Sequence, residues 1–153
     1  MTDLHYVKLT DIHAEDFVPL LNNPKIRRHL IEHPQFDTES IQEWLNTKIA
    51  MDARAGCQIR AVFYRGRLVG WCGIQWENEQ YEIAIILDPK RWGLGKRVFH
   101  DMMHWAKALG HEIISIHLLD TRPNSKFLRS IANEVLESQF LGHRFLTYQL
   151  SVK

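Results

Sequence analysis

The sequence lacks the features that would direct a chain into or onto a membrane. Its longest apolar runs, such as 83–87, do not approach the roughly 20 residues that a helix needs to span a bilayer. The first five residues do not follow the charged-then-apolar pattern of a signal peptide. We therefore expect a cytoplasmic protein without a membrane partner.

An excess of charge of one sign is also missing. The chain has 19 Lys and Arg against 18 Asp and Glu, a net charge of +1, so no global field draws it to nucleic acid. It also lacks a complete phosphate-loop motif with its Lys-Ser/Thr pair. These absences argue against a nucleotide or nucleic-acid binder, and we expect no nucleic-acid partner.

Cysteine is scarce, and no metal signature is present. Cys57 and Cys72 fall on the two predicted arms of a hairpin that turns near 65–67, two or three residues out of register, so we expect free thiols. Histidines occur at i, i+4 spacing in two pairs, His29 with His33 and His100 with His104. Because no carboxylate or cysteine pattern accompanies either pair, we interpret them as solvated helix faces and predict no metal site.

The chain does contain enough apolar residues for one full core. It has 153 residues, of which 45% are hydrophobic. No repeat, linker or low-complexity tract interrupts it, so we predict a single domain over 1–153. Apolar periodicity predicts strands at 4–9, 57–64, 68–76, 81–87, 111–119, 135–140 and 144–152, and helices at 13–21 (capped by Thr10-Asp11), 25–31, 95–109 and 123–132, with one more helix starting within 37–40 and ending before Gly56.

The predicted order is therefore β-α-α-α-β-β-β-α-β-α-β-β. This order indicates an α/β (α+β) fold with one mixed, mostly antiparallel sheet of about six or seven strands and helices on both faces. The strand after helix 95–109 should run parallel to the strand before it, since a helix joins them. A long helix over 123–141 is the alternative for the C-terminal region.

The stretch 88–110 organises the rest of the chain. It leaves an apolar strand, turns through Pro89, Gly93 and Gly95, and continues as a helix that Gly110 ends. No Ser, Thr, Asp or Asn caps the helix start, whose free N–H groups would suit an anion. The basic residues around this start are Lys90, Arg91, Lys96 and Arg97. We predict that a phosphate group binds here; an ordinary glycine turn with solvated basic side chains is the alternative.

This stretch and the element order resemble the GNAT acetyltransferase superfamily. The family's pyrophosphate loop has Gln or Arg, two residues, Gly, one residue, then Gly or Ala; residues 90–95 follow this pattern, with Lys90 in the first place. Asn124 matches an asparagine that the family carries at the start of the next helix. The N-terminal half, in 20–24 and 41–45, is similar to the branch that acetylates ribosomal-protein N-termini and related amines.

The resemblance implies acetyl-CoA as the co-substrate. The glycine-loop amides would hold its diphosphate, while the end of strand 81–87 and Asn124 would contact the pantetheine arm. Strands 81–87 and 112–119 would splay apart to admit the cofactor. The implied cofactor-binding residues are Ile86, Leu87, Lys90, Arg91, Trp92, Gly93, Leu94, Gly95, Lys96 and Asn124.

Glu82 is the candidate general base. It is the one carboxylate within an otherwise apolar strand, where burial favours proton uptake, and the family often places a Glu on this strand. The alternative is a solvated charge at the start of the strand, near Glu77 and Glu79. His117, inside a strand beside the implied cofactor position, is interpreted as a hydrogen-bonded core histidine.

The general acid departs from the family pattern. Where many relatives carry Tyr, this chain has Ile131, and where the ribosomal branch often carries Ser, it has Phe127. Ser130 is the first candidate and Ser125 the second, whereas Tyr148 on the last strand fits the core. The thiolate leaving unassisted is also open.

The resemblance implies an N-acetyltransferase that moves an acetyl group from acetyl-CoA to a primary amine by direct attack in a ternary complex. The acceptor is a protein N-terminus or a small-molecule amine, and the sequence does not choose between them. The alternative is a catalytically weak or inactive CoA-binding sensor or interaction module of the same fold. A free strand edge at the C-terminal hairpin makes a homodimer possible.

Overall fold

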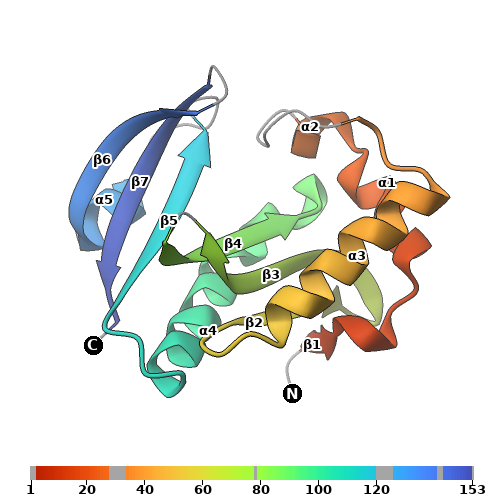
Figure 1. Cartoon of the computed structure of the whole chain (residues 1–153), viewed down its shortest axis with the longest axis horizontal. Helices are drawn as coiled ribbons and strands as arrows, with labels where there is room; N and C mark the ends of the chain where they lie inside the picture. The colour runs from red at the N-terminus through yellow and green to blue at the C-terminus, as the bar shows by residue number, and fades with distance from the viewer. Residues whose placement is uncertain (1–2, 28–33, 78, 120–125, 141–142, 153) are drawn as a thin grey trace.

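The computed structural model describes residues 3–27, 34–77, 79–119, 126–140 and 143–152 (Figure 1). Its strands are β1 (Leu4–Lys8), β2 (Gln58–Tyr64), β3 (Arg67–Glu77), β4 (Gln80–Leu87), β5 (Ile113–Leu119), β6 (Ala132–Phe140) and β7 (His143–Ser151). Its helices are α1 (Val18–Leu21), α2 (Pro24–Arg27), α3 (Thr38–Asp52), α4 (Gly95–Ala108) and α5 (Lys126–Ile131), with 3-10 turns η1 (Leu9–Asp11), η2 (Ala14–Phe17) and η3 (Pro89–Leu94).

The strands form one sheet in the order β1-β2-β3-β4-β5-β7-β6. The β4–β5 pair is parallel, as predicted, and the other neighbours are antiparallel. The β4–β5 pair is also short. It has two pairs of register partners, Glu82 with Ser115 and Ile83 with Ile116. Beyond these residues the two strands diverge, and the sheet separates into a β1–β4 part and a β5–β7–β6 part (Figure 1).

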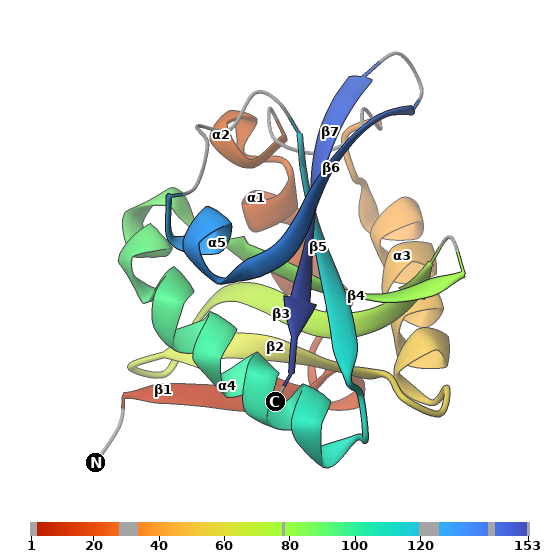
Figure 2. The ribbon, with the colours of Figure 1, turned by 90° about the vertical axis from the view of Figure 1, so that its left-hand side faces the viewer.

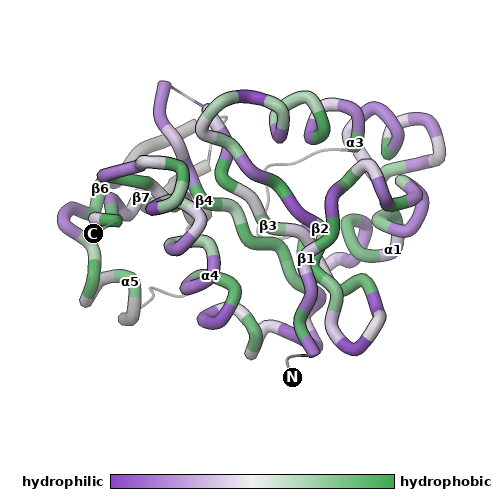
Figure 3. Tube along the Cα trace, turned by 90° about the horizontal axis from the view of Figure 1, so that it is seen from below, coloured by the Kyte–Doolittle hydropathy of each residue, from purple (hydrophilic) through white to green (hydrophobic). Residues whose placement is uncertain are grey.

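Helices cover both faces of the sheet, which confirms the predicted architecture (Figure 2). On one face α4 buries Val98, Met102 and Ala106 against strand residues that include Ile74 and Ile83. On the other face α1, η2 and α3 pack over β2, β3 and β4 in a second apolar cluster. Figure 3 colours much of β3 and β4 as hydrophobic between these layers. No helix in the described part of the chain is long and apolar enough to cross a bilayer.

The N-terminal helices differ from the prediction in one place. The predicted helix over 13–21 is split into the 3-10 turn η2 and the short α1, because Pro19 stands at the start of α1 and cannot donate a backbone hydrogen bond. Thr10 and Asp11 lie in η1 and do not cap η2, which begins after His13 without a side-chain cap. By contrast, α3 starts where predicted, with a capping box between Asp37 and Ser40 at 2.8 and 2.9 Å.

The β2–β3 hairpin confirms the prediction of free cysteines. Arg65 and Gly66 form its turn, both with positive φ (51° and 79°), as a two-residue type I′ connection requires. With this two-residue turn, Tyr64 pairs with Arg67 and not, as predicted, with about Leu68; a bulge between Val62 and Phe63 then shifts the register by one residue further from the turn. Cys72 pairs with Arg60, three residues from Cys57, and both thiols are free and buried.

The C-terminal region is a short helix followed by a hairpin. The alternative of a long helix over 123–141 is wrong, because α5 ends at Ile131 and β6 begins at Ala132. The predicted end of the helix near Ala132 is confirmed to within one residue, whereas its predicted start lies outside the described residues. The β6 residues pair with β7 from Ala132 onward, so tertiary strand pairing overrides the helical periodicity of this segment. Asn124 and Ser125 lie outside the described residues. The sheet ends at β6, and the pairing of two copies through this edge stays a prediction.

Candidate active site

Buried polar side chains gather at the point where β4 and β5 meet. In the part of the chain that the structure describes, four polar or charged residues are buried, with exposed fractions of 2 to 9%: Gln75, Glu82, Ser115 and Thr147. They come from four different strands, and the register pairs Gln75 with Glu82 and Glu82 with Ser115. Because adjacent strand residues alternate between faces, the sequence neighbours of these residues lie in the apolar core on the other face.

Glu82, the predicted base, stands in the middle of this cluster. It is buried, which excludes the alternative of a solvated charge at the strand start. Its Oε2 lies 2.8 Å from Nε2 of His117 on β5. The Glu82 side chain keeps 11% of its surface exposed and the His117 side chain keeps 21%, so the carboxylate is buried yet still accessible. A buried carboxylate with a hydrogen-bond partner can accept a proton from a substrate.

His117 is held from both sides of its ring. Its Nδ1 lies 2.6 Å from the Thr147 hydroxyl on β7, and these two residues are register partners across the β5–β7 pair. The side-chain amide of Gln80 lies beside this ring: its Nε2 is 3.3 Å from His117 Nε2, and its Oε1 accepts a hydrogen bond from the Ser115 hydroxyl at 3.0 Å. The predicted hydrogen-bonded histidine is therefore confirmed, and its main partner is the predicted base.

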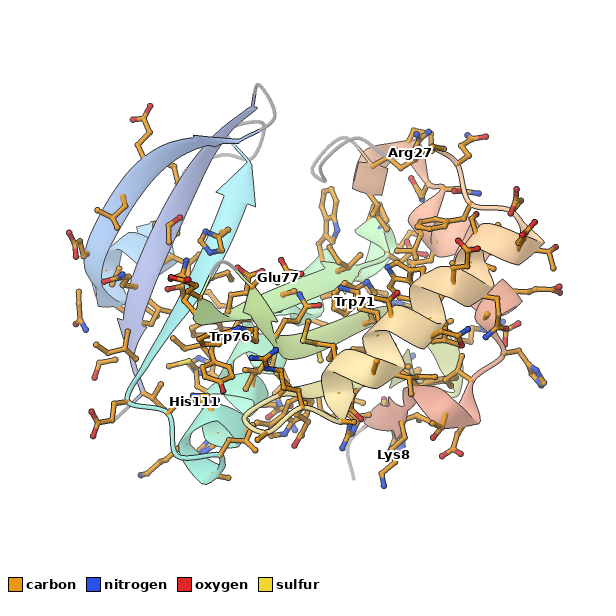
Figure 4. All side chains as sticks on the ribbon, in the orientation of Figure 1. Lys8, Arg27, Trp71, Trp76, Glu77 and His111 are labelled. Carbon is orange, nitrogen blue, oxygen red and sulfur yellow. The ribbon has the colours of Figure 1, made fainter. Side chains whose placement is uncertain are left out.

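A second carboxyl group, that of Glu77, lies beside Glu82. Burial around this carboxyl raises the pKa of Glu77, and the negative charge of Glu82 and a hydrogen bond to it raise that pKa further. Two carboxyl groups in hydrogen-bond contact cannot both stay ionised without cost, so such a pair tends to retain one proton. Figure 4 shows Glu77 where β3 approaches β5, with Trp71 further along β3 beneath α3.

Lys48 on α3 brings a cation to the same face of the sheet. Its Nζ donates a hydrogen bond to Oε1 of Gln75 and lies 4.6 Å from the centre of the Trp71 ring. Burial lowers the pKa of the Lys48 amine, while the charges of Glu77 and Glu82 oppose this shift. The Trp71 indole N–H is buried without a hydrogen-bond partner among the described residues. The site therefore brings together two carboxyl groups (Glu77 and Glu82), an imidazole (His117) and an amine (Lys48).

The glycine loop follows directly from β4. Asp88 accepts a hydrogen bond from the Lys90 amide at 2.9 Å, which caps η3, whereas α4 itself starts after Leu94 without a side-chain cap, as predicted. One amide of this region is not free, because the Gly95 N–H donates to the Trp92 carbonyl. At least one amide at the predicted anion site therefore already has a partner within the chain.

Gly93 and Gly95 have open space around them. Among the described residues, a Cβ atom at either position would have no atom from outside its own stretch of chain within 4 Å, and neither glycine has a positive φ. The packing of the described residues and the backbone conformation therefore do not require glycine here. A close approach of a ligand to the backbone would require it, and the diphosphate at this loop stays a prediction.

The other predicted cofactor residues lie around this loop. Trp92 is 44% exposed, and its indole N–H donates to the Leu87 carbonyl at 2.9 Å, which ties the loop to the end of β4. The Arg91 guanidinium lies 4.9 Å from the centre of the Tyr64 ring, which holds it over the β2–β3 hairpin. Ile86 is buried beneath α3, whereas Lys90 and Lys96 are exposed.

Other candidates lie apart from this cluster. Ser130, the candidate acid, is exposed on α5. Tyr148 is fully buried in the core, as predicted. His100 and His104 are exposed on α4, as predicted for a solvated face, while His29 and His33 lie outside the described residues. Lys48, Gln75 and Thr147 were missed, because each becomes a site residue only through the packing of α3 and the register of the strands.

Comparison with known families and structures gives a consistent result. The profile of a family described as "Acetyltransferase (GNAT) domain" matches residues 3–130. A search of curated protein sequences finds no significant match.

Solved structures share the fold over nearly the whole chain. An acetyl transferase from Salmonella typhimurium that modifies the N-terminal serine of ribosomal protein L7/L12 is 14% identical, with a TM-score of 0.73 and coverage of 98% of this chain and 94% of its own. Spermidine N-acetyltransferase from Vibrio cholerae, with CoA and spermine, is 16% identical (TM-score 0.72; 97% and 94%). The microcin C7 self-immunity acetyltransferase MccE, with acetyl-CoA and AMP, is 13% identical (TM-score 0.73; 97% and 92%).

Proposed function

Because this chain belongs to the GNAT acetyltransferase family, we propose that it transfers an acetyl group from acetyl-CoA to a primary amine by direct attack in a ternary complex. The observation that carries this proposal is the position of Glu82. Its buried carboxylate lies where β4 and β5 diverge, on the strand that leads into the glycine loop. The proposed base and the proposed anion site would therefore lie at the two ends of one short strand.

The chain's own groups suit acetyl-CoA. The uncapped start of α4 and the two unhindered glycines would receive the diphosphate, with Lys90, Arg91 and Lys96 supplying positive charge. Ile86 and Leu87 would contact the pantetheine arm along β4, since beyond Ile83 no β5 residue is in register with this strand. Asn124 stays our candidate for a further contact to that arm.

Glu82 would take the proton that the amine must lose. The cationic amine first gives one proton to the Glu82 carboxylate, which frees the nitrogen lone pair to attack the thioester carbonyl carbon. The carbon–sulfur bond then breaks to release the thiolate, and the nitrogen loses its second proton to solvent. Ser130 stays our candidate for protonating the thiolate, and release of the free anion is the alternative. A backbone N–H commonly stabilises the oxyanion in acyl transfer.

The acceptor that suits this site is a cationic amine. Glu77 and Glu82 form a carboxyl pair on the face that the acceptor would approach, and one ionised member is enough to attract an ammonium group. Lys48 beside them disfavours an acceptor with a second positive charge close to the reacting nitrogen. A peptide N-terminus or a small monoamine fits these charges better than a closely spaced polyamine.

The direct test is thiol release from acetyl-CoA in the presence of a panel of amines. The panel should contain an N-terminal peptide, a free amino acid, a simple monoamine and spermidine. We expect release that depends on the amine, with initial-rate plots that intersect, as sequential transfer in a ternary complex requires. Tight CoA binding without release for any amine would contradict the proposal and favour the sensor alternative.

A further inference from the structure

We propose that His117 and Thr147 form a positioning chain that holds the Glu82 carboxylate in the orientation needed for proton transfer. The inference rests on the proposed function, in which Glu82 accepts the proton of the amine. It concerns a different question, namely what keeps one carboxylate oxygen directed at the substrate. The observation behind it is that both ring nitrogens of His117 are engaged, one by Glu82 and the other by Thr147.

The donors and acceptors in this chain of contacts can be assigned from chemistry. An ionised carboxylate only accepts hydrogen bonds, so the 2.8 Å contact between Glu82 Oε2 and His117 Nε2 requires the proton on Nε2. In the neutral ring Nδ1 is then an acceptor, and the Thr147 hydroxyl, at 2.6 Å, donates to it. The chain therefore runs from Thr147 through His117 to Glu82. Because Nε2 is a donor in this assignment, the side-chain NH2 of Gln80, which lies 3.3 Å from it, makes no hydrogen bond to it.

This assignment separates the roles of the two titratable residues. Because both nitrogens of His117 are occupied, the ring has no free lone pair for the amine and is a positioning residue. Glu82 uses Oε2 for His117 and also lies in hydrogen-bond contact with Glu77, so a remaining lone pair of this carboxylate would take the substrate proton. A fixed carboxylate loses less entropy when it reaches the transition state than a freely rotating one does.

The backbone fixes all three groups. His117 and Thr147 are register partners across the antiparallel β5–β7 pair, and the parallel β4–β5 pair is in register at Glu82 with Ser115, two residues from His117. Thr147 and Glu82 are both buried, with exposed fractions of 5% and 9%. Side chains on rigid strands are placed more accurately than side chains on loops.

The test uses His117→Leu, His117→Gln and Thr147→Val, compared with His104→Gln and Thr47→Val as controls. The two control residues are exposed, on α4 and α3. The measured quantities are kcat/KM for one amine as a function of pH, and the Kd of CoA. The same amine is used throughout, so that its own titration contributes equally to every profile.

We expect His117→Leu to lower kcat/KM by about tenfold to hundredfold, the loss typical of one hydrogen bond to a charged group, with little change in the Kd of CoA. Gln keeps an N–H donor, so His117→Gln should recover part of the activity that His117→Leu loses. Thr147→Val should lower kcat/KM less than His117→Leu does. Both controls should behave like the wild-type protein.

Two outcomes would overturn the inference while leaving the proposed function intact. One is a Glu82→Gln variant that loses turnover while His117→Leu keeps the wild-type kcat/KM at every pH. The other is a His117→Gln variant that recovers none of the activity lost in His117→Leu. If Glu82→Gln itself keeps full turnover, the proposed base is wrong, and the failure belongs to the proposed function.

Discussion

The two faces of the sheet at the β4–β5 junction are built from neighbouring residues of the same strands, yet they differ completely in chemistry. The face under α4 contains Ile74, Ile83 and Ile116, all buried in one apolar cluster. The opposite face contains Gln75, Glu82 and His117, joined by hydrogen bonds and ionic contacts to Lys48 and Thr147. The strand period of two residues places these sets on opposite sides.

The two faces of this short junction therefore have separate roles: the apolar face contributes to stability, and the polar face is suited to chemistry. The apolar face gains free energy from burial, at about 25 cal/mol per Å² of apolar surface. The polar face gains little from burying its groups, since each hydrogen bond to a protein partner replaces one to water. A role in handling charge and protons would explain why this face is polar. Substitutions on the two faces should therefore have different effects.

The largest effect should come from Glu82→Gln on the polar face. Removal of a general base typically costs about 10²–10⁴-fold in turnover, and the amide keeps the size of the side chain. We expect that loss in kcat, measured by amine-dependent thiol release, with the Kd of CoA unchanged. Glu79→Gln is the matched control, since Glu79 is an exposed residue of the preceding turn. Equal losses in both variants would show that the effect is not specific to the site.

The next effect should come from Ile83→Ala, one residue away on the apolar face. Ile83 is 2% exposed, so truncation leaves a cavity and should lower the free energy of unfolding by about 2–5 kcal/mol. Urea denaturation followed by tryptophan fluorescence measures this change. Ile113→Ala, at a residue that is 59% exposed, should change it by less than about 0.5 kcal/mol. Similar values for the two variants would contradict the division between faces.

A smaller effect concerns the loop that continues from β4. Reversal of two charges, Arg91→Glu with Lys96→Glu, should weaken CoA binding by about tenfold or more, since charge-assisted contacts to phosphate would be replaced by repulsion. The weakening should decrease at high salt because the side chains are exposed. Lys107→Glu, at the far end of α4, is the control. Unaltered affinity after the double reversal would place the diphosphate elsewhere.

The smallest effect should be on stability through Glu77. The pKa of the Glu77 carboxyl is raised above its ordinary value of 4.5. In the pH interval between these two pKa values, the folded state binds more protons than the unfolded state does. Stability should therefore fall as the pH rises through the interval, and Glu77→Gln should remove this dependence. The free energy of unfolding of the two proteins, measured from pH 4 to pH 8, should diverge in favour of the variant. A constant difference across the range would argue against the raised pKa.

The sequence predicted the features that depend on short stretches of chain. The glycine loop led to the GNAT family, which the profile match confirms, and the isolated carboxylate in an apolar strand led to Glu82, whose burial is confirmed. The partners of Glu82 could not be predicted in the same way. His117 and Thr147 meet only through the β5–β7 register, and Lys48 reaches Gln75 only through the packing of α3; sequence periodicity does not determine either of these.

The C-terminal region shows a different limit. Phe127, Ile131, Val135 and Leu136 fit a helical period in the sequence, yet β6 begins at Ala132 because β7 offers a strand partner over its whole length. Strand propensity depends on such neighbours more than helix propensity does. The short 3-10 turn before Pro19 was missed for a more local reason, the missing amide hydrogen of proline.

The most direct test of the central claim, that the polar face at the β4–β5 junction is the reaction centre, is a crystal structure with bound CoA. We predict the diphosphate at the amides that begin α4, the pantetheine arm alongside Ile86 and Leu87, and the sulfur atom on the same face as Glu82 and His117. A diphosphate bound away from Gly93–Lys96, or a sulfur atom on the α4 face beside Ile83, would contradict it.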